Sequence, residues 1–358
     1  MERRGRLKKL RSVKITTTII VLAALVGLLA GVPSGCSKGA GIGGLTPLSV
    51  PRPSGFPEPV SWYRDNPVTR EGFELGRRLF YEGRLSIDNM HPCSSCHQQV
   101  AGFGTFEHDR SHGVFNSHTL RNAPVLFNLN WNRSFHLDSA FASPENAIAQ
   151  PITGTLEMGE TWEGVIAKLE QDASYREQFK NVFGSPFIRP VHVLKAISQY
   201  LSQIVSADSK YDRMKRGQAS FTTEETNGYQ VFRTHCAGCH PEPLFTDHSY
   251  RNIGLPLDPL LNDKGLMRIS GRREDSLRFR VPTLRNLYIS SNYMHDGRFN
   301  TPGQCIEHYR SGIQAGPTLD SALAGGLTLT NTEVSHLLRF LRTLTDSSVL
   351  TDPRLGKP

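Results

Sequence analysis

Two five-residue stretches decide the fold: Cys93-Ser94-Ser95-Cys96-His97 and Cys236-Ala237-Gly238-Cys239-His240. Both read Cys-x-x-Cys-His, which is the attachment motif of a c-type haem. The two thiols of such a motif bond to the porphyrin vinyl groups, and the histidine becomes the proximal ligand of the iron. A thioredoxin-like redox pair needs no histidine, and a zinc site or a disulfide framework leaves both histidines unexplained. The sequence therefore predicts two covalently bound haems.

The spacing of the motifs predicts two domains. His97 and His240 stand 143 positions apart, which is too far for two adjacent motifs in one haem domain. We expect an N-terminal haem domain over residues 61–215 and a C-terminal haem domain over residues 216–350. Residues 36–60, rich in Gly, Ser and Pro, are expected to be a flexible tether.

The regular elements between the motifs are predicted to be helices. Apolar residues recur at helical spacing, and strand-like alternation is scarce. Thr223, with Glu225 in the first turn, is the expected N-cap of a helix that leads into the second motif. The expected fold class is mainly α, with two cytochrome-c-like haem domains. The other helices are predicted at residues 69–80, 161–170, 191–206 and 330–344.

The charge of the chain is concentrated at its N-terminus. The 358 residues carry a formal charge of +8, but residues 1–35 hold seven Lys and Arg against one Glu. The remainder is only slightly positive, which argues against a basic nucleic-acid-binding body. An apolar stretch follows Lys14, as in a secretory signal segment over residues 1–35.

The fate of this signal segment has three alternatives. Small residues before Cys36 are typical of a bacterial lipoprotein site, at which Cys36 would be lipidated, although Pro33 stands where such sites usually have Leu. Plain cleavage and an uncleaved anchor are the other two. Each predicts a periplasmic protein, tethered to a membrane in the lipoprotein case. The remaining cysteine, Cys305, is expected to be a buried free thiol.

The surroundings of both motifs resemble those of bacterial di-haem cytochrome c peroxidases and their MauG-type relatives. The resemblance runs in order over about residues 60–350. It implies a mainly helical protein with a peroxide-reacting N-terminal haem and an electron-transferring C-terminal haem, whose domains pack across a pseudo-two-fold interface. The matching segments are residues 75–80, 84–86, 121–124, 156–159, 243–247, 252–256, 281–286 and 293–299.

The resemblance assigns roles around the first haem. His97 would be its proximal ligand, and Glu157, in Thr-Leu-Glu-Met-Gly, matches the glutamate that moves a proton between the peroxide oxygens. The family often has a glutamine upstream, for which Asn146 and Gln150 are both candidates. Some members block the distal face with a histidine. His112 fits that position better than His118 does; otherwise the haem is permanently five-coordinate.

The second haem would have His240 as its proximal ligand. Its other ligand separates the branches of the family, because one branch uses Met and the MauG branch uses Tyr. Tyr309 falls at the family position, and Met294 is the alternative. A tyrosinate ligand would lower the haem potential, whereas a thioether raises it.

Two further features follow from the resemblance. The family has a Trp between its haems that relays electrons, and Leu137 takes that place here. Trp131, six residues earlier, is an aromatic nearby in sequence, although core packing is its expected role. The family also binds Ca²⁺ between its domains, and Asn122, Ser290 and Asn292 match its oxygen ligands.

Three functions agree with these features. The first is an exported cytochrome-c-peroxidase-type oxidoreductase, which reduces hydrogen peroxide to water with electrons from a small periplasmic cytochrome or cupredoxin. The second is a MauG-like, peroxide-dependent oxidase that modifies side chains of a partner protein. The third is a non-enzymatic di-haem electron carrier.

Overall fold

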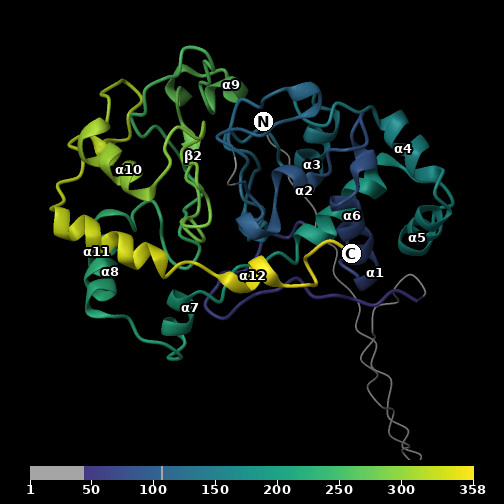
Figure 1. The fold of residues 1–358 in the computed structure, drawn as a ribbon, viewed down its shortest axis with the longest axis horizontal. Coiled ribbons are helices and arrows are strands. Elements are labelled where there is room, and N and C mark those ends of the chain that lie inside the picture. Colours follow the sequence, from purple (N-terminus) through teal and green to yellow (C-terminus); the bar gives the residue numbers. More distant parts are fainter. Residues whose placement is uncertain (1–43, 106–107) are drawn as a thin grey trace, which may run out of the picture. The chain divides into compact units, whose positions relative to one another are not determined.

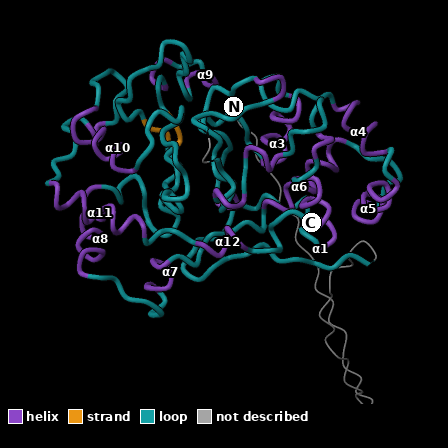
Figure 2. The backbone as a smooth tube through the Cα atoms, viewed as in Figure 1, coloured by secondary structure: helices purple, strands orange, loops and turns teal. Residues whose placement is uncertain are grey.

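Helices are the main regular elements of the protein, and long loops connect them (Figures 1 and 2). The computed structural model describes residues 44–105 and 108–358. The only strands within these residues, β1 (Tyr250–Arg251) and β2 (Phe279–Arg280), pair antiparallel. The helices are α1 (Arg70–Phe80), α2 (Cys93–Cys96), α3 (Pro144–Thr153), α4 (Trp162–Glu170), α5 (Ala173–Phe183), α6 (Pro190–Leu201), α7 (Lys210–Lys215), α8 (Thr223–His235), α9 (Met267–Ser270), α10 (Pro302–Glu307), α11 (Asn331–Arg342) and α12 (Ser347–Thr351).

The expected mainly helical class is confirmed, and the five predicted helices correspond to α1, α4, α6, α8 and α11. The cap of α8 and the end of α6 differ from expectation, and the other ends agree to within two residues. Thr222, not Thr223, is the N-cap of α8, and its side chain and that of Glu225 form a capping box. Helix α6 ends at Leu201, because Ser202 caps it and the chain then turns back at Ile204.

One helix crossing recurs in both halves of the chain. Helices α1 and α6 pack together, and so do α8 and α11. A glycine lies at each crossing. A Cβ atom on Gly76 would lie 1.9 Å from the Ala196 carbonyl oxygen, and one on Gly228 would lie 1.9 Å from that of His336. Each crossing therefore requires a residue without a side chain.

Two separate clusters of buried apolar side chains accompany these crossings. The first draws on residues 73–204, and the second on residues 211–344. Tyr211 belongs to the second cluster although it precedes the expected domain boundary at residue 216. The C-terminal residues Val349 and Leu355 return to the first cluster.

The C-terminal segment connects the two clusters. It runs from α11 through α12 toward α1 and α6, in yellow in Figure 1. There the Leu355 carbonyl oxygen accepts hydrogen bonds from the hydroxyl groups of Tyr81, at 2.9 Å, and Tyr200, at 2.6 Å. Gln99 donates to the carbonyl oxygens of Val349 and Asp352. The last residues of the chain thus complete the N-terminal half.

A buried polar network lies where the chain passes between the clusters. Asp346 is 1% exposed, and one of its carboxylate oxygens accepts from the Ser206 hydroxyl and from the backbone N–H groups of Ala207 and Asp208. Its own N–H donates to the Asn286 side chain, which in turn donates to Ser206. This network fixes three segments against one another.

Within the described residues, no helix is long and apolar enough to cross a membrane. The expected signal segment, Cys36 and residues 37–43 of the expected tether lie outside the described residues. Residues 44–60 are not a free tether as expected, because they pack on the body: the Leu48 N–H donates to the Val68 carbonyl oxygen, and Phe56 is 5% exposed.

The glycine at the α8–α11 crossing gives a test of this packing. Gly228→Ala is expected to lower the free energy of unfolding by about 3 kcal/mol, because a methyl group would overlap the backbone of α11. Urea unfolding of the holoprotein measures the change. Gly303→Ala, in α10, is the matched control, since a Cβ there meets only Thr301 Oγ1 at 3.7 Å. It should leave stability unchanged or raise it by up to about 1 kcal/mol. Equal losses in both variants would contradict the close crossing.

Candidate active site

The first Cys-x-x-Cys-His motif holds its histidine in the form that binds iron. Helix α2 carries Cys93 and Cys96, and His97 ends it. His97 Nδ1 lies 3.1 Å from the Phe103 carbonyl oxygen. Since a carbonyl oxygen only accepts, Nδ1 carries the proton and Nε2 keeps its lone pair. Burial lowers the pKa of His97 to about 4, so the ring is neutral at pH 7.

The second motif repeats this arrangement. Helix α8 leads directly into Cys236, and His240 Nδ1 lies 3.0 Å from the Phe245 carbonyl oxygen. Burial lowers the pKa of His240 as well. Each site thus presents a neutral imidazole with a free Nε2 beside two cysteines. Both sites fit a c-type haem, whose proximal ligand needs such an oriented ring.

Glu157 lies near the first motif and is hydrogen bonded by Gln150. Helix α3 carries Gln150 and ends at Thr153, and the following turn brings Glu157 back beside it. The Gln150 side chain hydrogen bonds the Glu157 carboxyl group, and the charge of Glu157 raises the pKa of Cys96. Burial raises the pKa of Glu157 itself. Of the two upstream candidates, Gln150 is the one in contact with Glu157.

His112 lies in a cluster of three imidazole rings. Its ring stacks on His108, with centroids 4.1 Å apart, and lies 4.2 Å from His118. Its backbone carbonyl lies against Cys96, with 3.9 Å between oxygen and sulfur. Burial, together with the charges of His108 and His118, lowers the pKa of His112. Within the described residues, no three His, Cys, Asp or Glu side chains are placed so that they could hold a metal ion.

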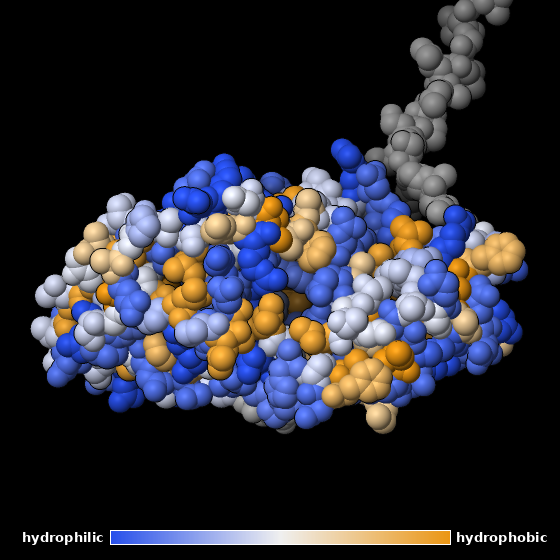
Figure 3. All heavy atoms as spheres, turned by 90° about the horizontal axis from the view of Figure 1, so that it is seen from above, coloured by the Kyte–Doolittle hydropathy of each residue, from blue (hydrophilic) through white to orange (hydrophobic). Residues whose placement is uncertain are grey.

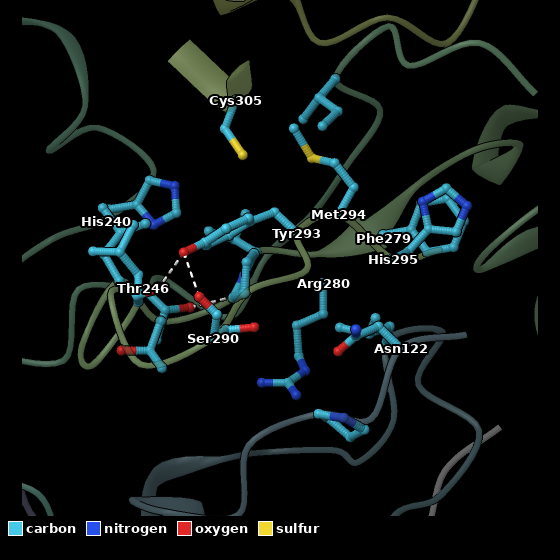
Figure 4. A pocket seen from close by; sticks show the side chains of 18 of the residues that line it. Asn122, His240, Thr246, Phe279, Arg280, Ser290, Tyr293, Met294, His295 and Cys305 are labelled. Atoms are coloured by element: carbon cyan, nitrogen blue, oxygen red, sulfur yellow. Dashed lines mark hydrogen bonds between the residues drawn. The ribbon is translucent and has the colours of Figure 1, made fainter. Parts of the chain in front are cut away.

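A cavity of about 380 Å³ surrounds the second motif. Tyr309, Met294 and Cys305 line it together with His240. Figure 4 shows the His240 ring, the Cys305 sulfur and the Met294 thioether directed toward a common space. Figure 3 shows that one face of the molecule has a hollow bordered by hydrophobic side chains, which agrees with the apolar residues that predominate in the lining.

Tyr309 lies in an uncommon helical segment. The π-helix His308–Gly312 follows α10, and such wide turns often occur at functional sites. Burial raises the pKa of Tyr309, and the nearby thiols of Cys305, Cys236 and Cys239 raise it further. Tyr309 is therefore close to both cysteines of the second motif. Cys305 is a free thiol, and burial raises its pKa to about 12.

Leu137 lies at the junction of the two halves. Its side chain lines the cavity, and its carbonyl oxygen accepts a 2.8 Å hydrogen bond from the Arg280 backbone N–H. Next to it, Asp138 pairs with Arg121 at 2.8 Å. Trp131 is 4% exposed and packs on Phe56, with ring centroids 5.0 Å apart, as expected of a core residue.

The three residues that match the calcium ligands line the same cavity. Asn122 donates through its side chain to the Asp109 carbonyl oxygen and through its backbone to that of His295, at 2.9 Å each. The Ser290 hydroxyl donates to the Asn292 carbonyl oxygen at 2.9 Å.

Arg280 is a residue of this cavity that was not predicted from the sequence. Arg280 in β2 reaches the cavity directly before the matched segment at residues 281–286. A basic residue beside that segment was the signal that could have found it.

Comparison with known proteins identifies the family. The family model for di-haem cytochrome c peroxidase matches residues 70–220. The chain is 30% identical over 308 residues to the methylamine utilization protein MauG of Methylorubrum extorquens, with 84% of this chain and 85% of that protein covered. It is 32% identical over 286 residues to cytochrome c551 peroxidase of Nitrosomonas europaea, with 78% and 81% covered.

The chain belongs to the di-haem cytochrome c peroxidase and MauG family. A crystal structure of a MauG-like protein associated with microbial copper homeostasis is 31% identical and superimposes with a TM-score of 0.76, covering 86% of this chain and 98% of that one. Membership of the di-haem cytochrome c peroxidase and MauG family implies two c-type haems and a peroxide-dependent oxidoreductase activity.

The buried carboxyl group of Glu157 predicts a pH effect on stability. Its pKa is higher in the folded than in the unfolded state, so the folded state binds more protons between the two values and loses stability as the pH rises through that window. Glu157→Gln removes this loss, by about 1.4 kcal/mol for each pH unit by which the pKa is raised. Urea unfolding at several pH values, starting near pH 4, measures it. The exposed Glu163→Gln should follow the wild type; an unchanged pH slope in Glu157→Gln would contradict the elevated pKa.

Proposed function

We propose that this protein is an exported di-haem peroxidase that reduces hydrogen peroxide to water. Electrons would arrive from a small periplasmic cytochrome or cupredoxin through the C-terminal haem. The observation that carries the proposal is the half-buried Glu157, hydrogen bonded by Gln150 and close to Cys96 of the first motif. An electron carrier would have no need of such a group.

The proposed chemistry divides between the haem and the chain. The first haem, held by Cys93, Cys96 and His97, would supply the iron that binds peroxide and the electrons that cleave its O–O bond. Glu157 would accept a proton from peroxide and return it to the oxygen that departs as water. The Gln150 amide holds the carboxylate in place. The neutral ring of His97, oriented by the Phe103 carbonyl oxygen, would be a ligand of the iron.

For the second haem we propose His240 and Tyr309 as axial ligands. The support for Tyr309 is its place in the cavity of His240 and its electrostatic interaction with Cys236 and Cys239. Met294 lines the same cavity and remains the alternative. His112 is proposed only as a distal ligand of the first haem that would have to leave its contacts with His108 and His118.

A second candidate is a MauG-like oxidase of protein side chains. Tyr309 favours it, because the MauG branch uses Tyr as the distal ligand, and three proteins named MauG are among the relatives. Leu137 weakens it, because an aliphatic side chain cannot serve as a redox relay between the haems. We therefore keep the peroxidase as the leading proposal.

Three further features belong to the proposal. The N-terminal haem domain would span residues 61–215 and the C-terminal one residues 216–350, related by a pseudo-two-fold interface. A Ca²⁺ ion would bind near the junction through Asn122, Ser290 and Asn292, since oxygen ligands suit this ion. The protein would be periplasmic, either free or tethered through lipidated Cys36.

Removal of the proposed proton acceptor tests the function. Glu157→Gln is expected to lower the steady-state rate of peroxide reduction with a reduced cytochrome by about 10²- to 10⁴-fold, with both haems still attached. Glu163→Gln, which removes an exposed carboxylate on α4, should keep the wild-type rate. An undiminished rate in Glu157→Gln would refute the proton-transfer role. Reaction of the wild type with one equivalent of peroxide but no turnover with any small donor would instead favour the second candidate.

The ligand of the second haem is tested by a pair of variants. Loss of a hard, anionic ligand raises a haem potential. Tyr309→Phe should therefore raise the midpoint potential of one haem by about 59 mV or more, which is a tenfold or larger change in the ratio of reduced to oxidised haem at a given potential. Met294→Leu should leave both midpoints within a twofold change. Spectroelectrochemical titration measures them. The reverse pattern would assign Met294 as the ligand.

A further inference from the structure

The cavity around the second motif contains one arginine whose charge is balanced by no residue that the structure describes. Three arginines line this cavity. Arg251 pairs with Asp247 and Asp320, at 2.8 Å each, and Arg285 pairs with Asp212 at 2.7 Å. Arg280 forms no ion pair with any described residue.

The contacts of Arg280 are weak and neutral. Its Nε lies 3.4 Å from the His136 carbonyl oxygen, and one terminal nitrogen lies 3.5 Å from the Asn132 side-chain oxygen. Both distances are at the long end for hydrogen bonds. Burial lowers the pKa of Arg280, which still leaves a guanidinium group charged at pH 7. A cation kept from water without a partner is costly, so the position calls for an anion.

The free side of Arg280 faces the cavity. Figure 4 shows its side chain projecting into the cavity, with the guanidinium group turned toward the blue ribbon of the N-terminal half. The residue itself is half-buried, and it lines this cavity.

His248 adds a second polar group without a partner. It lines the same cavity, and neither of its buried ring nitrogens has a hydrogen-bond partner among the described residues. Burial and the nearby charge of Arg280 lower the pKa of His248 to about 4, so its ring is neutral and offers one N–H donor. A neutral donor next to a cation suits a carboxylate.

The residues that line the cavity indicate which anion would bind to Arg280. His240, Cys236 and Cys239 line the same cavity as Arg280 and His248. A porphyrin attached there brings two propionate carboxylates into it. We propose that Arg280, assisted by His248, binds a propionate of the C-terminal haem at the junction with the N-terminal half. This inference rests on the proposed function, because it requires a haem attached at Cys236 and Cys239.

The position of Arg280 links this carboxylate to the first haem site. Its backbone N–H bonds to Leu137, and its side chain contacts the carbonyl of His136. His136 in turn interacts electrostatically with His97, the proximal ligand of the first motif. Arg280 is thus a positioning residue at the place where the family Trp is replaced by Leu137. Its charge disfavours the oxidised form of the second haem.

The test is a redox titration of charge variants, each first counted for covalent haem. Arg280→Gln removes the charge and keeps a hydrogen-bonding side chain. It should lower the midpoint potential of one haem by about 59 mV or more, which is a tenfold or larger change in the ratio of reduced to oxidised haem at a given potential. Arg280→Lys, which keeps the charge, should stay within threefold of the wild type. Arg278→Gln is the matched control, since Arg278 pairs only loosely with Asp275, at 3.9 Å.

Each outcome decides the inference. Midpoints of Arg280→Gln within twofold of the wild type would overturn it. Loss of the second haem from Arg280→Gln but not from Arg280→Lys supports it, since the charge is then what holds the haem. Loss from both variants would overturn it, because a role in packing would then be indicated. Fewer than two haems in the wild type would refute the proposed function instead, independently of Arg280.

Discussion

The carboxylate of Asp346 is the interaction on which the arrangement of the two halves depends. One of its oxygens accepts three hydrogen bonds from residues 206–208, while the backbone of Asp346 is held by Asn286. These contacts are polar, buried and directional, unlike the two apolar clusters on either side. A directional network of this kind fixes one geometry, whereas apolar packing alone tolerates small displacements. Leu137 and Arg280 join the halves at another point, through the 2.8 Å hydrogen bond between their backbones.

The two haem motifs are alike in their histidines and different in their other neighbours. The histidine of each motif donates to a carbonyl oxygen five or six residues further along the chain. The half-buried Glu157, with Gln150, lies near the first motif, whereas Tyr309, Met294 and Cys305 line the cavity of the second. Two identical attachment motifs with different neighbouring residues allow two haems to carry out different reactions.

The sequence predicted best those features that depend on residues close together in the chain. The spacing of Cys and His within each motif, the helical periodicities and the family segments predicted the fold class, the family and the main helices. It was less informative about α3, α5, α7, α10 and α12, which are short or weakly periodic. The choice of Gln150 over Asn146 depends on how the chain folds back after Thr153, which no local pattern encodes. Arg280 was missed for a related reason: only the assembled cavity reveals that its neighbours Arg251 and Arg285 are paired with carboxylates, whereas Arg280 has no ion pair with any residue in the described ranges.

Because the C-terminal segment packs on the N-terminal half, the two halves are not completed in the order in which they are synthesised. A chain is made from its N-terminus, yet Val349 and Leu355 belong to the first apolar cluster. The N-terminal half therefore stays incomplete until the last residues have emerged, while the second cluster, which ends at Leu344, can form slightly earlier. A deletion at the extreme C-terminus would consequently damage the half of the molecule that is most distant from it in sequence. The N-terminal half is therefore not an independent piece that can be cut out at a domain boundary.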